Sequence, residues 1–252
     1  MPLAPNSIRS YVGNIVSFAG HFMGEPDDRS LRAWKLVLVR VSAWMPKSVD
    51  SRPALGREVF RAALGDRRSP DAVRLALGFC FDTASRAGDF LTEPRARSAA
   101  AVPMPLSHMR VGTGLDGAPW AELMTTVKGD RTGEVARIRA SCSSSSPAFH
   151  PCGFGTARAI RVWVTHRRER GARGDEPLWR LPGGGPVTAQ HVIALLRRHT
   201  DKPVSRHTVR ISSASIAVAS GGMSLSALAD LGGRKTPGAC KRYVRALGVV
   251  DG

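Results

Sequence analysis

Five side chains of this sequence could together act on a phosphodiester group. They are two arginines, a lysine, a histidine and a tyrosine: Arg86, Arg210, Lys128, His207 and Tyr243. Two guanidinium groups can bind the non-bridging oxygens of a phosphodiester and stabilise the charge that builds on them in the transition state. A tyrosine hydroxyl can attack phosphorus as a covalent nucleophile, and a lysine is suited to protonate the departing oxygen. The set therefore indicates phosphoryl transfer without a metal ion.

The histidine and one arginine lie at the start of a stretch that predicts a buried helix. His207 and Arg210 begin a run, ending at Ser220, whose residues are almost all small or apolar. Such a run is typical of a helix buried on every side. A charged arginine on it needs an anionic partner, because an unpaired charge is costly to bury.

Two further helices are expected after this one. The pair Gly221-Gly222 ends the buried helix, and Ser224 can cap the next helix. Thr236-Pro237 opens a third helix, which carries Tyr243 on its apolar face. Tyr243 is therefore predicted to face inward, toward the buried helix.

Arg86 follows a predicted pair of helices. A short helix is expected at residues 55–64, and Pro70 starts a second, strongly apolar helix that breaks at residues 82–85. Arg86 stands directly after this break, with Asp89 close behind it. Arg86 is thus predicted to close a buried helix.

Lys128 lies in a predicted β-hairpin. Residues 92–119 are rich in Pro, Ala, Gly and Arg and predict irregular structure with one edge strand. Residues 120–127 and 135–140 alternate apolar and polar side chains, as half-buried strands do. The letters KGDRTG between them form a polar turn with two glycines. This hairpin presents Lys128 and Arg131 near its tip, and either residue can supply the cation.

Two more helices are expected between the hairpin and the buried helix. The first starts near Gly153, with its apolar residues inward and its arginines largely outward, and Thr188 caps the second. The arginines expected on the outer side are Arg158, Arg161, Arg167 and Arg168. The charged run HRRERGARGDE is predicted to be solvated.

The N-terminal part predicts a separate small domain. Apolar residues recur at helical spacing in two stretches, the second beginning near Ser30 and ending at Pro46. The polar connector KSVDSRP that follows is the best candidate for a domain boundary. We therefore expect a short helical domain at residues 1–50. A mainly helical α+β domain with a small antiparallel sheet is expected at residues 51–252.

The composition indicates a polyanionic partner. The 252 residues include 37 Lys and Arg against 20 Asp and Glu, a net charge of +17, and the pI is near 11.2. Arginine predominates, and its planar fork suits phosphate oxygens, so nucleic acid is the expected partner. The sequence has no basic amphipathic helix and no apolar run of about 20 residues, so a membrane partner is not favoured. No signal peptide is evident. An intracellular location is expected: the nucleus in a eukaryote, the cytoplasm or nucleoid in a bacterium.

The cysteines favour reduced thiols. The four of them are irregularly spaced, at Cys80, Cys142, Cys152 and Cys240, which does not suit a disulfide framework. His150 and Cys152 lie near Cys142, but the chain has no CxxC pair. A metal site is therefore not expected.

In this order the motifs resemble those of the tyrosine recombinases, or phage-type integrases, and specifically their retroelement-associated eukaryotic branch. The likeness spans about residues 53–252. LALGFCFDTASRAGDFL resembles the helix that ends in the family's first catalytic arginine, and VKGDRTG resembles its lysine-bearing hairpin. HTVRISSASIAVASG matches its His-x-x-Arg motif, and LGGRKTPGACKRYVR resembles its closing helix. The catalytic residues that this resemblance implies are Arg86, Lys128, His207, Arg210, Arg234 and Tyr243, with Asp89 as an accompanying acidic residue.

The resemblance also implies a reaction and a partner. Tyr243 would cleave one strand of double-stranded DNA through a 3′-phosphotyrosyl link, release a 5′-hydroxyl and allow rejoining to a partner strand. No ATP, metal ion or other cofactor would be consumed. Residues 1–50 would form a shortened core-binding domain that closes the other side of the DNA. Exchange would take place in a homo-tetramer on two synapsed duplexes.

One position departs from the family pattern. Where the family has His or Trp after the letters LG, this chain holds Gly233 or Arg234, with one extra residue before Tyr243. Arg234 can donate to a phosphate but cannot act as a neutral histidine. Ordinary packing also explains single members of the set, such as Tyr243 as a core aromatic residue. Two alternatives stay open: a protein of this fold that only binds DNA, and a basic RNA-binding protein.

Overall fold

The computed structural model describes residues 27, 30, 53–85, 91–93, 102–126 and 135–231. The chain divides into two compact units, Met1–Ser51 and Arg52–Gly252. In the first unit, Ser30 is helical and its backbone N–H donates to Asp27 Oδ1 at 2.6 Å, as at the start of the helix expected there. The other predicted residues of this unit lie outside the described residues, and its DNA-clamping role stays a prediction.

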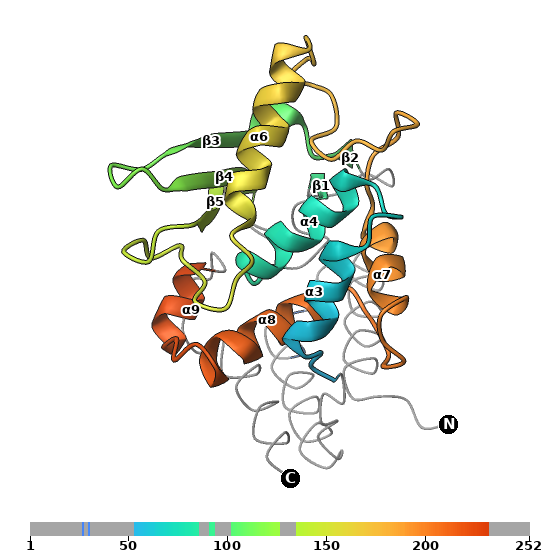
Figure 1. Ribbon diagram of the computed structural model, residues 1–252. Coiled ribbons are helices and arrows are strands. Elements are labelled where there is room, and N and C mark those ends of the chain that lie inside the picture. Colours follow the sequence, from blue (N-terminus) through green and yellow to red (C-terminus); the bar gives the residue numbers. More distant parts are fainter. Residues whose placement is uncertain are drawn as a thin grey trace. The chain divides into compact units, whose positions relative to one another are not determined.

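The second unit is mainly helical with a small antiparallel sheet, which confirms the expected α+β architecture (Figure 1). Its described helices are α3 (Arg57–Gly65), α4 (Asp71–Asp82), α6 (Thr156–Glu169), α7 (Ala189–Arg197), α8 (Thr208–Ala219) and α9 (Leu225–Leu231). Its strands are β1 (Thr92–Glu93), β2 (Val102–Pro103), β3 (Met109–Thr113), β4 (Pro119–Thr126) and β5 (Val135–Ser141), and the 3₁₀-helix η1 is Leu106–His108. None of the helices in the described ranges has the length and apolar character needed to cross a bilayer.

The sheet has the order β3-β4-β5, with β3 at an edge. The alternation read from the sequence is confirmed, because Ala121, Leu123 and Ile138 are buried while Arg137 and Arg139 are exposed. Helix α6 packs against the sheet (Figure 1). The edge strand expected between residues 92 and 119 is β3, whereas the short β1–β2 pair was not predicted.

Helix α4 lies at the centre of the unit and packs against α3, α6, α7 and α8. Its apolar run is fully buried, with Phe79 and Phe81 inaccessible to solvent. Gly78 allows the close approach to α6, because a Cβ there would lie 2.6 Å from Thr156 Oγ1. The segment before α7 contributes the buried Trp179 to this core.

The prediction of an outward Arg167 was wrong. Its side chain is only 10% exposed, and it donates to Glu176 Oε2 at 2.9 Å. It also donates to the backbone oxygens of Pro177 and Leu178, at 2.6 and 2.9 Å. The charged run 166–176, which begins in the last turn of α6, is therefore partly packed against the protein, since a buried guanidinium needs this many acceptors.

Candidate functional site

The start of α8 carries the two predicted site residues that fall within the described part of the chain. His207 is the N-cap residue of α8, and Arg210 lies in its first turn with only 8% of its surface exposed. Residues spaced by three share one face of a helix. The Ser205 N–H donates to Thr208 Oγ1 at 2.8 Å, and the His207 N–H donates to Ser205 Oγ at 3.2 Å. These bonds fix the backbone at the helix start, from which both side chains extend.

Helix α8 is buried on every side along most of its length, as expected. Each residue from 208 to 215 is buried, including three serines and Arg210. Such a helix cannot rotate or slide without breaking its packing. Arg210 is therefore held on a rigid element.

The turn that ends α4 comes directly before Arg86 in the sequence. It is a Schellman motif, in which the Ser85 N–H donates to Cys80 O at 3.0 Å and the Ala84 N–H donates to Phe81 O at 3.1 Å. Ala84 takes the left-handed position with φ +46°, which is uncommon for a residue other than glycine. Ala84 is buried and belongs to the same small apolar cluster as Ala214 of α8. The helix thus breaks where the sequence predicted, in a defined geometry.

A buried hydrogen-bond chain ties this turn to α8. His150 Nδ1 accepts the Cys152 N–H at 3.1 Å, so the single proton of the neutral ring lies on Nε2. Nε2 then donates to Ser213 Oγ over 2.9 Å, and Ser213 Oγ donates to Phe81 O over 2.5 Å. The rings of His150 and Phe81 also stack, with centroids 5.2 Å apart. Burial lowers the pKa of His150 to about 4, which keeps the ring neutral.

Asp82, the last residue of α4, caps the start of α6. Its two carboxylate oxygens accept the backbone N–H groups of Phe154 and Thr156, each at 2.7 Å. A carboxylate is favourable at this place because the N-terminus of a helix carries free donors and partial positive charge. Burial nevertheless raises the pKa of Asp82, and the N–H bonds oppose that rise. Asp82 therefore positions α4 and α6 and is not placed to act on a substrate.

Sequence reasoning missed the structural roles of His150, Ser213 and Asp82. His150 stood out only as a neighbour of Cys142 and Cys152, and Asp82 only as a helix breaker. Within the described ranges, no group of three His, Cys, Asp or Glu side chains could hold a metal ion. No local pattern identifies these three, because their partners lie 63 to 132 residues away.

The structure describes the two strands of the predicted hairpin but not the residues that connect them. Strands β4 and β5 are antiparallel neighbours, and Thr126 pairs with Val135. Residues 127–134 therefore connect two paired strands, and Lys128 and Arg131 fall in this connection. The other predicted site residues that lie outside the described residues are Arg86, Asp89, Arg234 and Tyr243. Of the predicted set, only His207 and Arg210 are placed.

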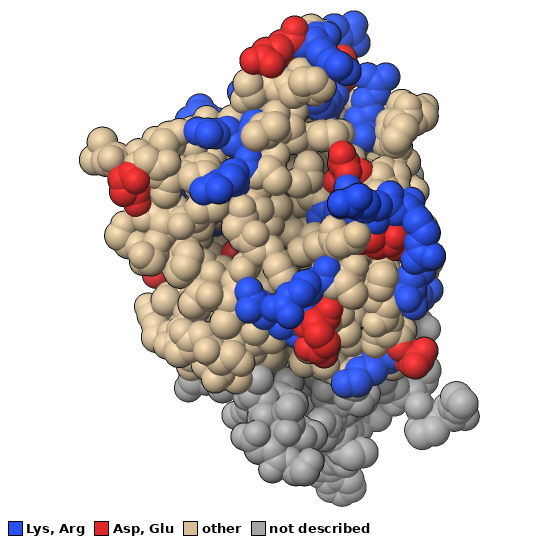
Figure 2. All heavy atoms as spheres, in the orientation of Figure 1, with Lys and Arg blue, Asp and Glu red and all other residues tan. Residues whose placement is uncertain are grey.

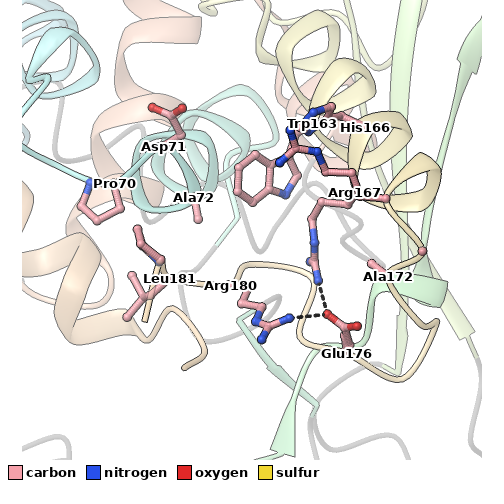
Figure 3. Close-up of a pocket in the computed structure, with 13 residues that line it drawn as sticks. Pro70, Asp71, Ala72, Trp163, His166, Arg167, Ala172, Glu176, Arg180 and Leu181 are labelled. Atoms are coloured by element: carbon pink, nitrogen blue, oxygen red, sulfur yellow. Dashed lines mark hydrogen bonds and ion pairs between the residues drawn. The ribbon is translucent and has the colours of Figure 1, made fainter. Parts of the chain in front are cut away.

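A cavity of about 470 Å³ lies elsewhere, between the end of α6, the start of α4 and residues 176–182 (Figure 3). Arg167 and Arg180 point toward Glu176 from two sides and donate to its Oε2 at 2.9 and 2.8 Å. The Arg173 N–H and Arg180 hold the pKa of Glu176 below its usual range. Because Glu176 already pairs with both arginines, the cluster is better explained as a structural ion-pair network than as an anion site.

The chain was compared with known proteins. No protein-family model matches it, and no curated protein matches it. Among solved structures, a lambda integrase fragment, crystallised as a dimer bound to a COC′ core site, has a TM-score of 0.49 and 17% identity over 96% of this chain and 79% of its own. XerA recombinase has a TM-score of 0.47 and 12% identity, covering 98% of this chain and 81% of its own.

The Tn1549 transposon integrase, in complex with transposon right-end DNA, has a TM-score of 0.44 and 11% identity. The match covers 84% of this chain and 68% of that one. These structures are integrases and recombinases, the class that the motifs resemble. With TM-scores below 0.5, these matches carry no argument about this chain, and its function is argued from its own residues.

Proposed function

We propose that this protein cleaves and rejoins strands of double-stranded DNA through a 3′-phosphotyrosyl intermediate. The Tyr243 hydroxyl would lose its proton to a nearby base or water and attack the phosphorus, forming the P–O bond to tyrosine as the bond to the 5′-oxygen breaks. Arg86 and Arg210 would bind the non-bridging oxygens. Lys128 would protonate the leaving 5′-oxygen. If Arg131 fills this place, its guanidinium stays charged and would donate a hydrogen bond to that oxygen instead. Attack by a 5′-hydroxyl would reverse the step and release Tyr243.

One observation carries the proposal: the turn that leads into Arg86 is bonded to the helix that carries Arg210. Ser213, one helical turn after Arg210, donates to Phe81 O in that turn. Ala84 of the turn belongs to the same apolar cluster as Ala214. A phosphate clamp needs two guanidiniums held on rigid elements. The packing of α4 against α8, which carries Arg210, supports this proposal. His207 and Arg234 would add donors to the same phosphate.

The charge of the molecule supports DNA as the partner. The net charge is +17, and Figure 2 shows basic side chains at many places on the visible face with fewer acidic ones. Phosphate contacts by Lys and Arg supply most of the affinity of proteins for DNA. A homo-tetramer on two synapsed duplexes is part of the proposal, because exchange requires two cleaved duplexes held together.

A suicide DNA substrate tests the proposal. A nick a few nucleotides 3′ of the cleavage site lets the short fragment that carries the 5′-hydroxyl diffuse away, which prevents rejoining. The enzyme should then accumulate as a covalent protein–DNA adduct on a denaturing gel. Tyr243→Phe should abolish the adduct, because it removes the nucleophilic oxygen. Tyr11→Phe is a matched control, since these are the two tyrosines of the chain, and it should leave the adduct unchanged.

The outcomes separate the alternatives. Absence of an adduct in the wild-type protein, with DNA binding intact, would leave a recombinase-fold protein that only binds DNA. An adduct that survives Tyr243→Phe would contradict the assignment of the nucleophile. Tighter binding to structured RNA than to duplex DNA at matched salt would contradict both DNA readings.

A further inference from the structure

The β3–β4–β5 sheet has a second face, opposite to the one against α6. Because side chains alternate along a strand, the buried Ala121, Leu123 and Ile138 mark one face, and their sequence neighbours mark the other. On this other face Arg110 and Arg139 are exposed, and Trp120 is half-buried. We call it the open sheet face, and its residues are Arg110, Gly112, Trp120, Glu122, Met124, Arg137, Arg139 and Ser141.

The register of the strands sets a row of cations on the open sheet face. Arg110 pairs with Glu122, and Glu122 pairs with Arg139 on the other side. Arg137 pairs with Met124, toward the 127–134 connection that carries Lys128. Three arginines therefore face one carboxylate. In the described part of the chain the ion pairs are made by other side chains, so these guanidiniums are not neutralised within 4 Å.

The face also holds an aromatic platform. Gly112 stands opposite Trp120, and a Cβ at residue 112 would lie 2.5 Å from Trp120 Cζ2, so glycine lets the indole lie across the neighbouring strand. The Arg139 guanidinium carbon lies over the indole, 4.6 Å from the ring centroid. A hollow of about 240 Å³ adjoins this pair and is lined mainly by the serine loop at 141–146 and by Asp116. The hollow is smaller than a drug-sized pocket and suits one planar group.

We propose that the open sheet face binds a single DNA strand. Arg110, Arg137 and Arg139 would contact successive phosphates, and one unpaired base would stack on the Trp120–Arg139 pair. Single strands are held in this way by basic surfaces with aromatic side chains, because every base has a π-face. A duplex presents no free base face, so the platform is useful only for an unpaired strand.

The proposal gives the face a role that rests on the proposed function. Strand exchange frees a strand with a 5′-hydroxyl, and that strand has to be kept until it attacks the partner. The open sheet face starts beside the 127–134 connection, where the leaving oxygen would be protonated. An acidic peptide could pair with the arginines but would not use the indole. Binding of such a peptide in place of a DNA strand would therefore contradict the proposal.

Binding is measured with the full chain carrying Tyr243→Phe, so that cleavage plays no part. Fluorescence anisotropy compares a twelve-nucleotide oligothymidylate with a duplex of the same length at matched salt. Trp120→Ala should weaken binding of the single strand roughly fivefold to a hundredfold, the range for loss of one stacked base. Duplex affinity should change less than twofold. Trp120→Phe should restore most of the single-strand affinity.

The arginines are tested separately, in case Trp120→Ala disturbs folding. The double variant Arg137→Gln with Arg139→Gln should reduce the salt slope of single-strand binding by about 1.4, or 0.7 for each lost phosphate contact. Arg158→Gln on the outer side of α6, also exposed, should not change it. Equal losses for single strand and duplex, or competition by poly-glutamate as strong as by oligothymidylate, would overturn the proposal. Both results are independent of whether the protein cleaves DNA.

Discussion

His150 occupies a buried position in which a charged imidazole is unfavourable. Burial is the main cause of its low pKa of about 4, and the nearby positive charge of Arg57 lowers the pKa further. The hydrogen bonds of the ring suit the neutral form, since Nδ1 accepts from Cys152 and Nε2 donates to Ser213. Protonation of Nδ1 would turn this acceptor into a donor, and it would then face the Cys152 N–H, which is also a donor. The neutral ring is thus part of the native state.

We predict that His150 makes the stability of the protein depend on pH below 6.5. The unfolded histidine, with a pKa near 6.5, takes up a proton before the folded one, so stability falls as the pH drops from 6.5 toward the folded pKa of about 4. Between pH 7.5 and pH 5 the loss should be about 2 kcal/mol. Urea unfolding of wild-type protein and of His150→Gln at both pH values measures it. An equal pH dependence in the two proteins would contradict the prediction.

Some site residues could be predicted from sequence and others could not. Arg210 was evident because a charge inside a small, apolar helical run is unusual, and the structure confirms that it is buried. Ser213 was one serine among several in the same run, and its partner Phe81 lies 132 residues away. Hydrogen bonds of this range leave no periodic signal, so only the fold identifies them.

At the level of elements, α4 and α8 form the part of the proposed site that the structure describes best. They are joined by apolar packing around Ala84 and by the hydrogen bond from Ser213 to Phe81. Rigid elements hold reacting groups more precisely than loops do. The α4–α8 contact should therefore matter more for cleavage than for DNA affinity.

We predict that Ser213→Ala slows adduct formation at saturating DNA, by up to about a hundredfold if the turn before Arg86 shifts by an ångström. Stability should fall by about 1 to 3 kcal/mol because His150 Nε2 loses its acceptor. The matched control is Ser215→Ala on the same helix, because Ser215 Oγ is buried and has no hydrogen-bond partner among the described residues. Single-turnover cleavage and duplex affinity are measured for both variants. Equal cleavage rates for Ser213→Ala and Ser215→Ala would contradict a positioning role of Ser213.

The helices and strands were largely predictable because their hydrophobic periods are regular. The α8 run, the capping of α7 by Thr188 and the β4–β5 alternation all follow from side-chain spacing. The inward Arg167 and the buried Trp179 were not predicted. Arg167 lies in the last turn of α6, and Trp179 lies in the irregular segment that follows. In both places tertiary partners, such as Glu176 for Arg167, decide burial.

For the whole molecule, the excess of basic residues decides the class of partner. With a net charge of +17, the protein would repel other cations and attract polyanions over distances of about a Debye length. Figure 2 shows that the basic side chains on the visible face are spread over several elements. Charge spread in this way favours a long partner that contacts many of these side chains at once.

We therefore predict that affinity for a duplex of about thirty base pairs falls a thousandfold or more between 50 and 200 mM salt, as for about six or more phosphate contacts. The slope of log affinity against log salt, measured by anisotropy, checks this. Tyr243→Phe changes no charge at neutral pH, so its slope should equal that of the wild type even though it cannot form the adduct. A slope near zero would contradict a phosphate-dominated interface. Since the slope depends on contacts and the adduct on Tyr243, the two measurements separate a protein that only binds DNA from one that also cleaves it.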